Sequence, residues 1–195
     1  MLDDLASKIV QHRPVALGEI GLDYFRDLSD HAAQRRAFAA QLELAATMQM
    51  PVIIHMRGEV EADLKHELDR TPSDLTCILH SFDGTADLAA YALARGFLFG
   101  VGGLVTRASS IQLREIVRSL PLESMLLETD APYLTPAGVK DRRNSPVNIP
   151  VIAKAVAILK GVPVEEVART TTKNAVRVFG LPVTLAADVA PAVLS

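Results

Sequence analysis

The sequence has 195 residues and a formal net charge of −3, which suits one domain with a sizeable core and is short for two. Apolar residues make up 49% and charged residues 22%, a composition that excludes a disordered chain. The slightly acidic balance also excludes a broadly basic surface, so any contact with nucleic acid must be local to a site.

The beginning of the chain predicts no export signal. Its first residues, MLDDLASKIVQHRP, are acidic at the start and lack the basic and apolar regions of a signal peptide. They predict instead a helix before the first strand. The single cysteine, Cys77, has no partner for an internal disulfide and is expected to be a buried small hydrophobe. These features favour a cytoplasmic protein in a reducing compartment.

Five short apolar runs predict five strands. The runs are continuous rather than alternating, which is typical of strands covered on both faces in a parallel sheet. They occupy residues 15–23, 51–56, 76–82, 97–103 and 124–131. Residues 86–105 resemble a membrane span only in length, because Arg95 and Gly96 interrupt the apolar stretch. A helix, a glycine cap and a buried strand explain this segment, and no membrane partner is expected.

Helical patterns fill the intervals between the strands. In residues 29–50 either Ser29 or Asp30 is the expected N-cap, and Phe38, Leu42 and Ala45 share one face. Further helices are predicted in the following segments: 85–96, 108–120, 149–161, 162–170 and 172–180. Pro146 and Pro150 are placed to start the first of the last three helices, and Gly161 and Gly180 to end helices. The alternation of strand and helix predicts an α/β fold made of βαβ units, with one domain over residues 1–181 and a tail over 182–195.

Four predicted strand ends carry a carboxylate or an imidazole. In an α/β barrel or an open parallel sheet, ligands bind at the carboxyl ends of the strands, and the residues there are Glu19, His55, His80 and Asp130. A lone histidine at such a place is usually a hydrogen-bonded structural residue. Four metal-ligating side chains at one rim instead indicate a site for Zn²⁺, Mn²⁺ or Mg²⁺.

Glu128 lies two residues before Asp130, on the same face of an ideal strand. Two interpretations are open. It either supports Asp130 from behind the metal site, or it is an ion-pair partner of a nearby lysine or arginine.

With these residues in view, the sequence resembles the TatD family of metal-dependent deoxyribonucleases, within the amidohydrolase-like TIM-barrel hydrolases. The resemblance runs from about Val15 to Leu181 through motifs in the family's order: ALGEIGLDY, PVIIHMR, ILHSFDG, LLETDAPYLTP, RRNSPVNIP and TTKNAVRVFG. It implies a (β/α)8 barrel that hydrolyses DNA phosphodiester bonds. Some members are 3′ to 5′ exonucleases on single-stranded or damaged DNA, so DNA, single-stranded or at 3′ ends, is the implied partner.

The resemblance also implies roles for single residues. Glu19 matches the carboxylate that bridges two metal ions, His55 and His80 match two imidazole ligands of one ion, and Asp130 matches the aspartate that binds the other ion or its water. Two divalent ions would activate a water for in-line displacement, and Asp130 would take its proton. Four basic residues are candidate phosphate donors, with a solvated basic surface as the alternative: Arg57, Lys140, Arg142 and Arg143.

The sequence departs from the family in two ways. The family's first strand carries a His-x-His pair that binds one metal, and no His-x-His occurs in these 195 residues. His12, His31 and His66 are expected to be ordinary surface residues, the last within an exposed helical turn. Five predicted strands are also fewer than the eight of a closed barrel, which has about 250 residues, so the barrel is expected to be incomplete at its N-terminus.

Three explanations compete for this deficit: a misplaced start of the sequence, which we favour, a homodimer that covers the open sheet edge, or a non-catalytic paralogue. A related hydrolase of amides, lactones or esters is the alternative activity, because fold alone does not fix function. A nucleotide-binding loop is not predicted, since FGVGGLV lacks the spacing of a phosphate-binding motif. Gly100, Gly102 and Gly103 are expected to permit close backbone approach instead.

Overall fold

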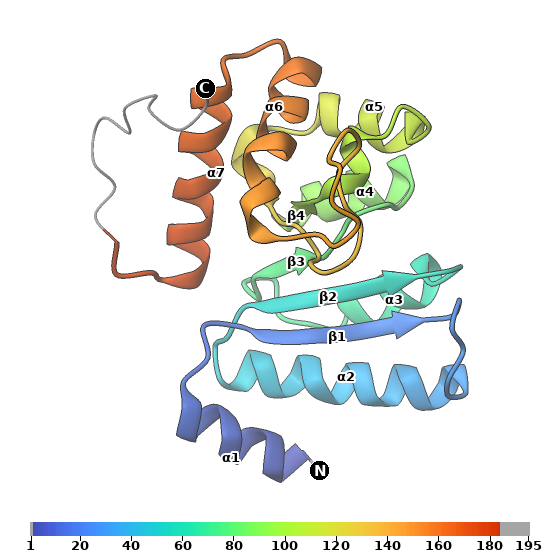
Figure 1. Ribbon diagram of the computed structural model, residues 1–195. Coiled ribbons are helices and arrows are strands. Elements are labelled where there is room, and N and C mark those ends of the chain that lie inside the picture. Colours follow the sequence, from blue (N-terminus) through green and yellow to red (C-terminus); the bar gives the residue numbers. More distant parts are fainter. Residues whose placement is uncertain (1, 184–195) are drawn as a thin grey trace. The chain divides into compact units, whose positions relative to one another are not determined.

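The computed structural model describes residues 2–183. The chain divides between His80 and Ser81 into two compact units, and each is described by itself. Helices and strands alternate along both (Figure 1). Within the described residues there are five strands, three in the first unit and two in the second.

The first unit is a three-stranded parallel sheet with its helices. Its elements in chain order are α1 (Leu2–His12), β1 (Leu17–Asp23), α2 (His31–Thr47), β2 (Val52–Arg57), α3 (Glu61–Leu68) and β3 (Cys77–Leu79). β2 pairs in parallel with β1 on one side and with β3 on the other. The register places Gly21 opposite His55 and Val52 opposite Cys77. Parallel pairing brings the carboxyl ends of the three strands to one edge.

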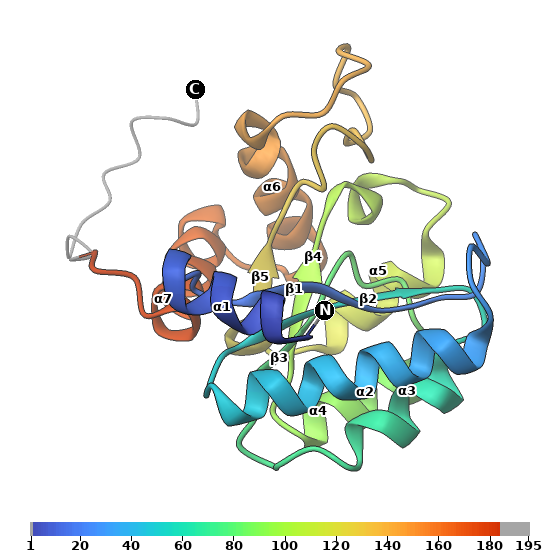
Figure 2. The ribbon, with the colours of Figure 1, turned by 90° about the horizontal axis from the view of Figure 1, so that it is seen from below.

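α2 is built as its sequence predicts. Asp30 is the N-cap, and its side chain accepts a hydrogen bond from the backbone N–H of Ala33 at 2.8 Å. Phe38, Leu42 and Ala45 are all buried. Burying a large apolar side chain stabilises the fold by about 1.5–3 kcal/mol, so this face fixes α2 to the unit. Figure 2 shows α2 and α3 side by side.

α3 differs from the predicted exposed turn. His66 is exposed, but Leu64, Glu67 and Leu68 are buried. The helix is amphipathic, and its residues at spacings of three and four lie on the packed face. The expectation of an exposed turn considered the charged residues of EADLKHELD and overlooked the two leucines.

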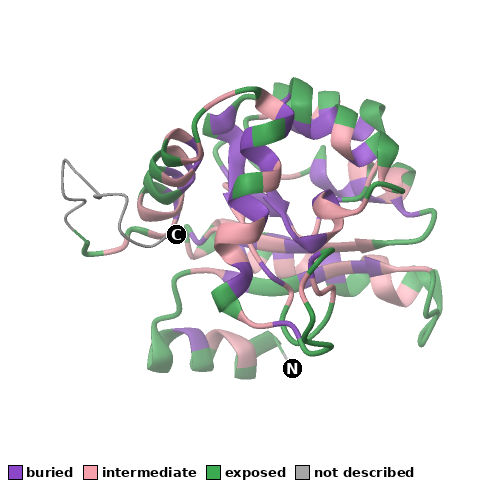
Figure 3. Cartoon of the chain, turned by 45° about the horizontal axis from the view of Figure 1, so that its top comes forward, coloured by how far each residue is buried: buried purple, intermediate pink, exposed green. Residues whose placement is uncertain are grey.

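The second unit contains the remaining two strands, β4 (Leu98–Val101) and β5 (Met125–Leu127), which pair in parallel. Its helices are α4 (Ala86–Ala94), α5 (Ile111–Ser119), α6 (Ile149–Lys160) and α7 (Val164–Phe179), with short 3-10 turns η1 (Gly103–Thr106), η2 (Leu122–Ser124) and η3 (Pro146–Asn148). Buried residues concentrate on the strands and on the helix faces turned toward them (Figure 3).

Cys77, in the first unit, is fully buried, as predicted.

The end of the chain forms one helix where two were predicted. The expected break falls at Thr171, but α7 continues through it. The Thr171 hydroxyl donates to the carbonyl of Val167 at 2.9 Å, so the polar group is satisfied inside the helix. Gly161 and Gly180 end α6 and α7 in the left-handed conformation, as predicted. Pro150 lies in the first turn of α6, whereas Pro146 opens η3.

Within residues 2–183, no single helix is long and apolar enough to cross a membrane. Residues Pro146–Lys160 and Val164–Phe179 reach that length and apolar character only when they are taken together, and the chain bends by 113° between them. The predicted tail, residues 182–195, lies outside the described residues from 184 onward.

Candidate metal centre

Three of the predicted ligands lie close together in the first unit. Glu19 lies within β1, His55 near the end of β2, and His80 just after β3, where its N–H continues the strand pairing to the Ile54 carbonyl at 2.9 Å. The Glu19 carboxylate faces both rings. Its Oε2 lies 3.6 Å from His55 Nδ1, and its Oε1 lies 3.5 Å from His80 Nε2.

These separations suit donors that share an ion. Metal bonds of 2.0–2.2 Å to nitrogen and oxygen place two neighbouring ligand atoms about 3.4 Å apart in a tetrahedral site. One carboxylate with two imidazoles is a donor set suited to Zn²⁺ or Mn²⁺. The set is not closed in this conformation: among residues 2–183, no group of three or more His, Cys, Asp or Glu side chains converges tightly enough to hold an ion. The separations of Glu19 from His55 and of Glu19 from His80 each suit a shared ion. Small side-chain rotations would have to bring all three donors onto the same ion.

Asp23 belongs to this cluster, although the sequence analysis did not single it out. Its Oδ2 lies 3.2 Å from His55 Nε2. When His55 Nε2–H donates to this carboxylate, the lone pair of Nδ1 faces Glu19, which is the tautomer a metal ligand needs. Asp23 is the last residue of β1 and shares the strand face of Glu19 at a spacing of four. Following the same strand face from Glu19 through Gly21 would have identified Asp23 from the sequence.

Hydrogen bonds hold Asp23 as a carboxylate. Burial acts to raise the pKa of Asp23, but the backbone N–H groups of Arg26 and Phe25 and the ring of His55 together keep it below its ordinary value. The two N–H groups donate to Oδ1 at 2.8 and 3.1 Å. Asp23 is therefore charged at neutral pH and is set to orient the His55 ring.

A pocket of about 390 Å³ opens beside these residues. Glu19, Asp23 and His55 line it together with Arg26 and Gln34. Gln34 accepts from the Asp23 N–H at 2.8 Å and donates to the Asp23 and Ser29 carbonyls, which ties the loop after β1 to α2. Arg26 is thus the basic residue that lines the pocket, and sequence reasoning missed it because it lies three residues beyond the strand.

Gly21 sets the approach of β1 to β2. Its φ is +149°, and a Cβ there would lie 1.9 Å from the carbonyl oxygen of His55. Only glycine permits this contact. Because Gly21 has no side chain, β1 can pack closely against the backbone of His55 in β2.

Glu128 and Asp130 lie in the second unit, just beyond β5. Glu128 Oε1 accepts a hydrogen bond from the Ser81 N–H at 2.7 Å. Its carboxylate fills the space over Gly100, where a Cβ would lie 2.2 Å from Oε2. Gly103 likewise faces the Leu134 carbonyl, at 2.0 Å from a built Cβ. Two of the three glycines of this run thus stand at the close approaches that were predicted. Asp130 is half-buried and has a φ of +56°, a conformation that aspartate tolerates better than most residues.

The candidate phosphate donors are exposed. The Arg57 guanidinium lies 4.5 Å from the centre of the Phe25 ring, and Lys140, Arg142 and Arg143 lie on a loop of the second unit. Buried Asn144 anchors that loop. Its Nδ2 donates to the Thr129 and Tyr133 carbonyls at 2.6 and 2.7 Å, and its Oδ1 accepts from Asn148.

The three remaining histidines do not take part in the cluster of Glu19, His55 and His80. His12 ends α1 at the surface. His31 opens α2, as predicted, stacks on Tyr24 at 3.5 Å between ring centres, and pairs with Asp27 at 3.1 Å. His66 lines a groove between α2 and α3.

Comparison with known proteins identifies the family. The family model described as TatD related DNase matches residues 1–180. The chain is 34% identical over 178 residues to the uncharacterized metal-dependent hydrolase YcfH of Escherichia coli K12, covering 91% of this chain and 67% of that protein. It is 42% identical over 175 residues to the 3′-5′ ssDNA/RNA exonuclease TatD of Pantoea ananatis, covering 86% of this chain and 66% of that protein.

Solved structures show the same fold. The crystal structure of YjjV, a TatD homologue from E. coli K12, superposes with a TM-score of 0.84 at 31% identity, over 93% of this chain and 70% of that one. A TatD family hydrolase from Entamoeba histolytica superposes with a TM-score of 0.78 at 27% identity, over 91% of this chain and 67% of that one. The α/β fold is that of the TIM-barrel metallohydrolases, as predicted. A match that spans 180 of the 195 residues, together with these relatives, shows that the chain belongs to the TatD-related DNase family.

Proposed function

We propose that the protein hydrolyses phosphodiester bonds of DNA with the help of a divalent metal ion. One observation carries the proposal: the Glu19 carboxylate faces one nitrogen of His55 and one of His80 at 3.6 and 3.5 Å, beside a pocket that Arg26 lines. A relative described as a 3′-5′ ssDNA/RNA exonuclease supports single-stranded nucleic acid with a 3′ end as the substrate.

Glu19, His55 and His80 would hold the ion. A bound Mg²⁺, Mn²⁺ or Zn²⁺ supplies a water of lowered pKa and polarises a phosphoryl oxygen. The donor set favours Mn²⁺ or Zn²⁺ over Mg²⁺ because two of its three members are imidazoles. The two-ion arrangement implied by the family stays a prediction.

The remaining residues would orient and exchange protons. Asp23 holds the His55 ring so that Nδ1 points to Glu19, a role that typically changes activity by about 10–100-fold when removed. Asp130 is the proposed acceptor of the proton from the attacking water. Arg26 would bind a phosphate oxygen in the pocket, because its guanidinium fork matches phosphate geometry. Arg57, Lys140, Arg142 and Arg143 would contact phosphates farther along the strand.

The test is the Glu19→Gln variant with a 5′-labelled single-stranded oligonucleotide in Mn²⁺. The amide keeps the shape of the side chain but loses the charge that binds a cation. We expect a loss of at least about 100-fold in cleavage rate, comparable to removal of one essential electrostatic contact, and weaker Mn²⁺ binding by calorimetry. The matched control is Glu43→Gln, an exposed glutamate of α2, which should leave both unchanged.

Unchanged cleavage in Glu19→Gln would remove Glu19 from the mechanism. Retained Mn²⁺ binding in the wild type without DNA cleavage, but with hydrolysis of an amide, lactone or ester, would move the proposal to that substrate class. Cleavage of RNA and DNA at equal rates would broaden the substrate without changing the site.

A further inference from the structure

An aromatic side chain stands exposed on the loop that forms one wall of the pocket beside the candidate metal centre. Phe25 lies just after β1 and is 68% exposed. On the same loop, Arg26 and the exposed Leu28 line the pocket itself. Single exposed apolar residues are common on protein surfaces, so exposure alone assigns no role to Phe25.

The backbone of Phe25 is held from two sides. Its N–H donates to Oδ1 of Asp23 at 3.1 Å, which ties it to a carboxylate of the cluster around the metal centre. The N–H of the preceding residue, Tyr24, donates to the Arg57 carbonyl at 2.9 Å. Gly58 allows this loop and the end of β2 to approach, because a Cβ there would lie 2.9 Å from the Phe25 nitrogen. The exposed ring therefore projects from a fixed backbone.

A guanidinium group stacks on this ring. The Arg57 carbon Cζ lies 4.5 Å from the centre of the Phe25 ring, a distance typical of a cation–π contact. Arg57 is the last residue of β2, two residues after His55. Stacking uses the flat face of the guanidinium and leaves its N–H edge for a phosphate. The pair therefore combines an oriented aromatic surface with a positive charge, the combination on which proteins bind single-stranded nucleic acid.

We propose that Phe25 is a stacking platform for one base of the nucleic-acid strand near its 3′ end, with Arg57 holding the ring and Arg26 binding a neighbouring phosphate. The inference rests on the DNase proposal for the identity of the substrate and adds a residue that positions it. Every base has a π-face, so this contact tolerates any sequence. An abasic nucleotide has no ring and loses the contact. The platform thus recognises the presence of a base and not its identity.

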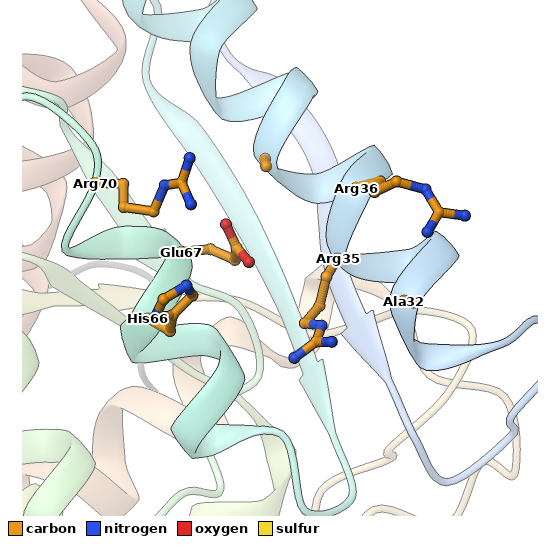
Figure 4. Close-up of a pocket in the computed structure, with 7 residues that line it drawn as sticks. Ala32, Arg35, Arg36, His66, Glu67 and Arg70 are labelled. Carbon is orange, nitrogen blue, oxygen red and sulfur yellow. The ribbon is translucent and has the colours of Figure 1, made fainter.

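The other hollow of the first unit lacks these features. It lies between α2 and α3 and has a volume of about 410 Å³. The described residues that line it include no phenylalanine, tyrosine or tryptophan. Figure 4 shows Glu67 lying between Arg35 and Arg70, and Arg36 directed away from Arg70. Because its arginines do not converge and a carboxylate lies among them, we place the strand at the pocket beside the metal centre.

The experiment is equilibrium binding of a short, 5′-fluorescein-labelled single-stranded DNA by anisotropy, in EDTA and again in Ca²⁺. One abasic nucleotide is placed in turn at each position near the 3′ end. In the wild type we expect one position at which it weakens binding by about tenfold, the loss typical of one stacked base. Phe25→Leu stays apolar but has no ring, so it should weaken binding of the intact strand by a similar factor. The abasic nucleotide should then cause no further loss.

Two further variants complete the design. Phe25→Trp should keep both the tight binding and the sensitivity to the abasic nucleotide, because indole also stacks on bases. Ile111→Ala is the matched control, since Ile111 of α5 is 66% exposed, nearly as much as Phe25. It should leave both quantities unchanged.

An abasic nucleotide that weakens binding equally in the wild type and in Phe25→Leu would overturn the platform, because the base would then be held elsewhere. Intact-strand binding that Phe25→Leu leaves unchanged would overturn it too, as would a wild type that binds no strand in either buffer. DNA cleavage in Mn²⁺ is measured separately. A wild type that shows the coupling between Phe25 and the abasic position but cuts no DNA would support the platform and refute the DNase proposal.

Discussion

Replacing Gly21 with alanine should destabilise the protein far more than an ordinary glycine substitution. Two costs combine at this residue. Its φ of +149° lies where residues other than glycine are strained, at a cost of about 1–3 kcal/mol. The added Cβ would also lie 1.9 Å from the His55 carbonyl oxygen and 2.8 Å from its carbon. Backbone atoms of a paired strand cannot rotate away, so β1 and β2 must separate.

The expected loss exceeds about 4 kcal/mol, a size that point substitutions reach exceptionally and through a few severe mechanisms, backbone strain and overpacking among them. Native stabilities are about 5–15 kcal/mol, so the variant should approach unfolding. With a urea m-value of about 2 kcal/mol/M, the midpoint should fall by about 2 M or the protein should not fold.

Gly96→Ala is the matched control. Gly96 also has a positive φ, +72°, but a Cβ there meets nothing within 4 Å. This variant should therefore show only the conformational cost, about 1–2 kcal/mol. Equal urea midpoints for the two variants would refute the reasoning, because they would show that the strand approach at Gly21 adds nothing.

Two other predictions concern stability. Burial, and next the hydrogen bond to Asp63, raise the pKa of Tyr24 to about 12. The folded state therefore favours the protonated phenol. The contribution of Tyr24 to folding stability should be complete below the ordinary pKa near 10 and be lost as pH rises from there to about 12. Tyr24 and Arg35 lower the pKa of Asp63. The contribution of Asp63 to stability should therefore be present above its unfolded pKa and be lost as pH falls from there through its lower folded-state pKa. Tyr24→Phe should cost about 1 kcal/mol at pH 7, and urea titrations should show this difference shrinking both above pH 10 and below pH 4; a constant difference would contradict it. Asn144→Ala should cost about 2–3 kcal/mol, because it leaves the Thr129 and Tyr133 carbonyls without their donor, and limited proteolysis should then cut residues 135–143 faster than in Thr135→Ala, whose hydroxyl makes one bond to the Arg142 carbonyl.

Much of the local structure could be predicted because it follows from hydrophobic patterning. The continuous apolar runs gave all five described strands, and the three-residue and four-residue spacings of Phe38, Leu42 and Ala45 gave the buried face of α2. The strand ends were less accurate. β3 and β5 cover only Cys77–Leu79 and Met125–Leu127, although His80 and Glu128, which follow them, each still donate a backbone N–H to the neighbouring strand. Apolar pattern alone does not report where pairing stops.

The grouping of Glu19, His55 and His80 was predictable from the sequence, but the residues that surround them were not. His55 and His80 lie near the ends of β2 and β3, as predicted, whereas Glu19 lies in the first half of β1 and not at its end. Parallel pairing of these neighbouring strands brings the three side chains together. Asp23, Arg26 and Gln34 were missed because their roles come from a loop whose path depends on side-chain hydrogen bonds. The roles assigned to the site residues stay predictions, with Asp130 as a metal ligand among them, and so does the single domain over residues 1–181.

The backbone after the strands gives an independent reason to look for chemistry there. Ser81 follows His80 with a φ of +45°, and Asp130 has a φ of +56°. Residues other than glycine seldom adopt this conformation, and when they do they concentrate at active sites, where the surrounding structure compensates the strain. At Ser81 the compensation is visible, since its N–H donates to the Glu128 carboxylate at 2.7 Å, a charge-assisted bond worth about 1.5–3 kcal/mol. Glycine at Gly100 leaves the space that this carboxylate occupies. Gly100→Ala should therefore displace Glu128, expose the strain at Ser81 and disturb the chain at His80, which explains why a buried run ends in a carboxylate two residues before Asp130.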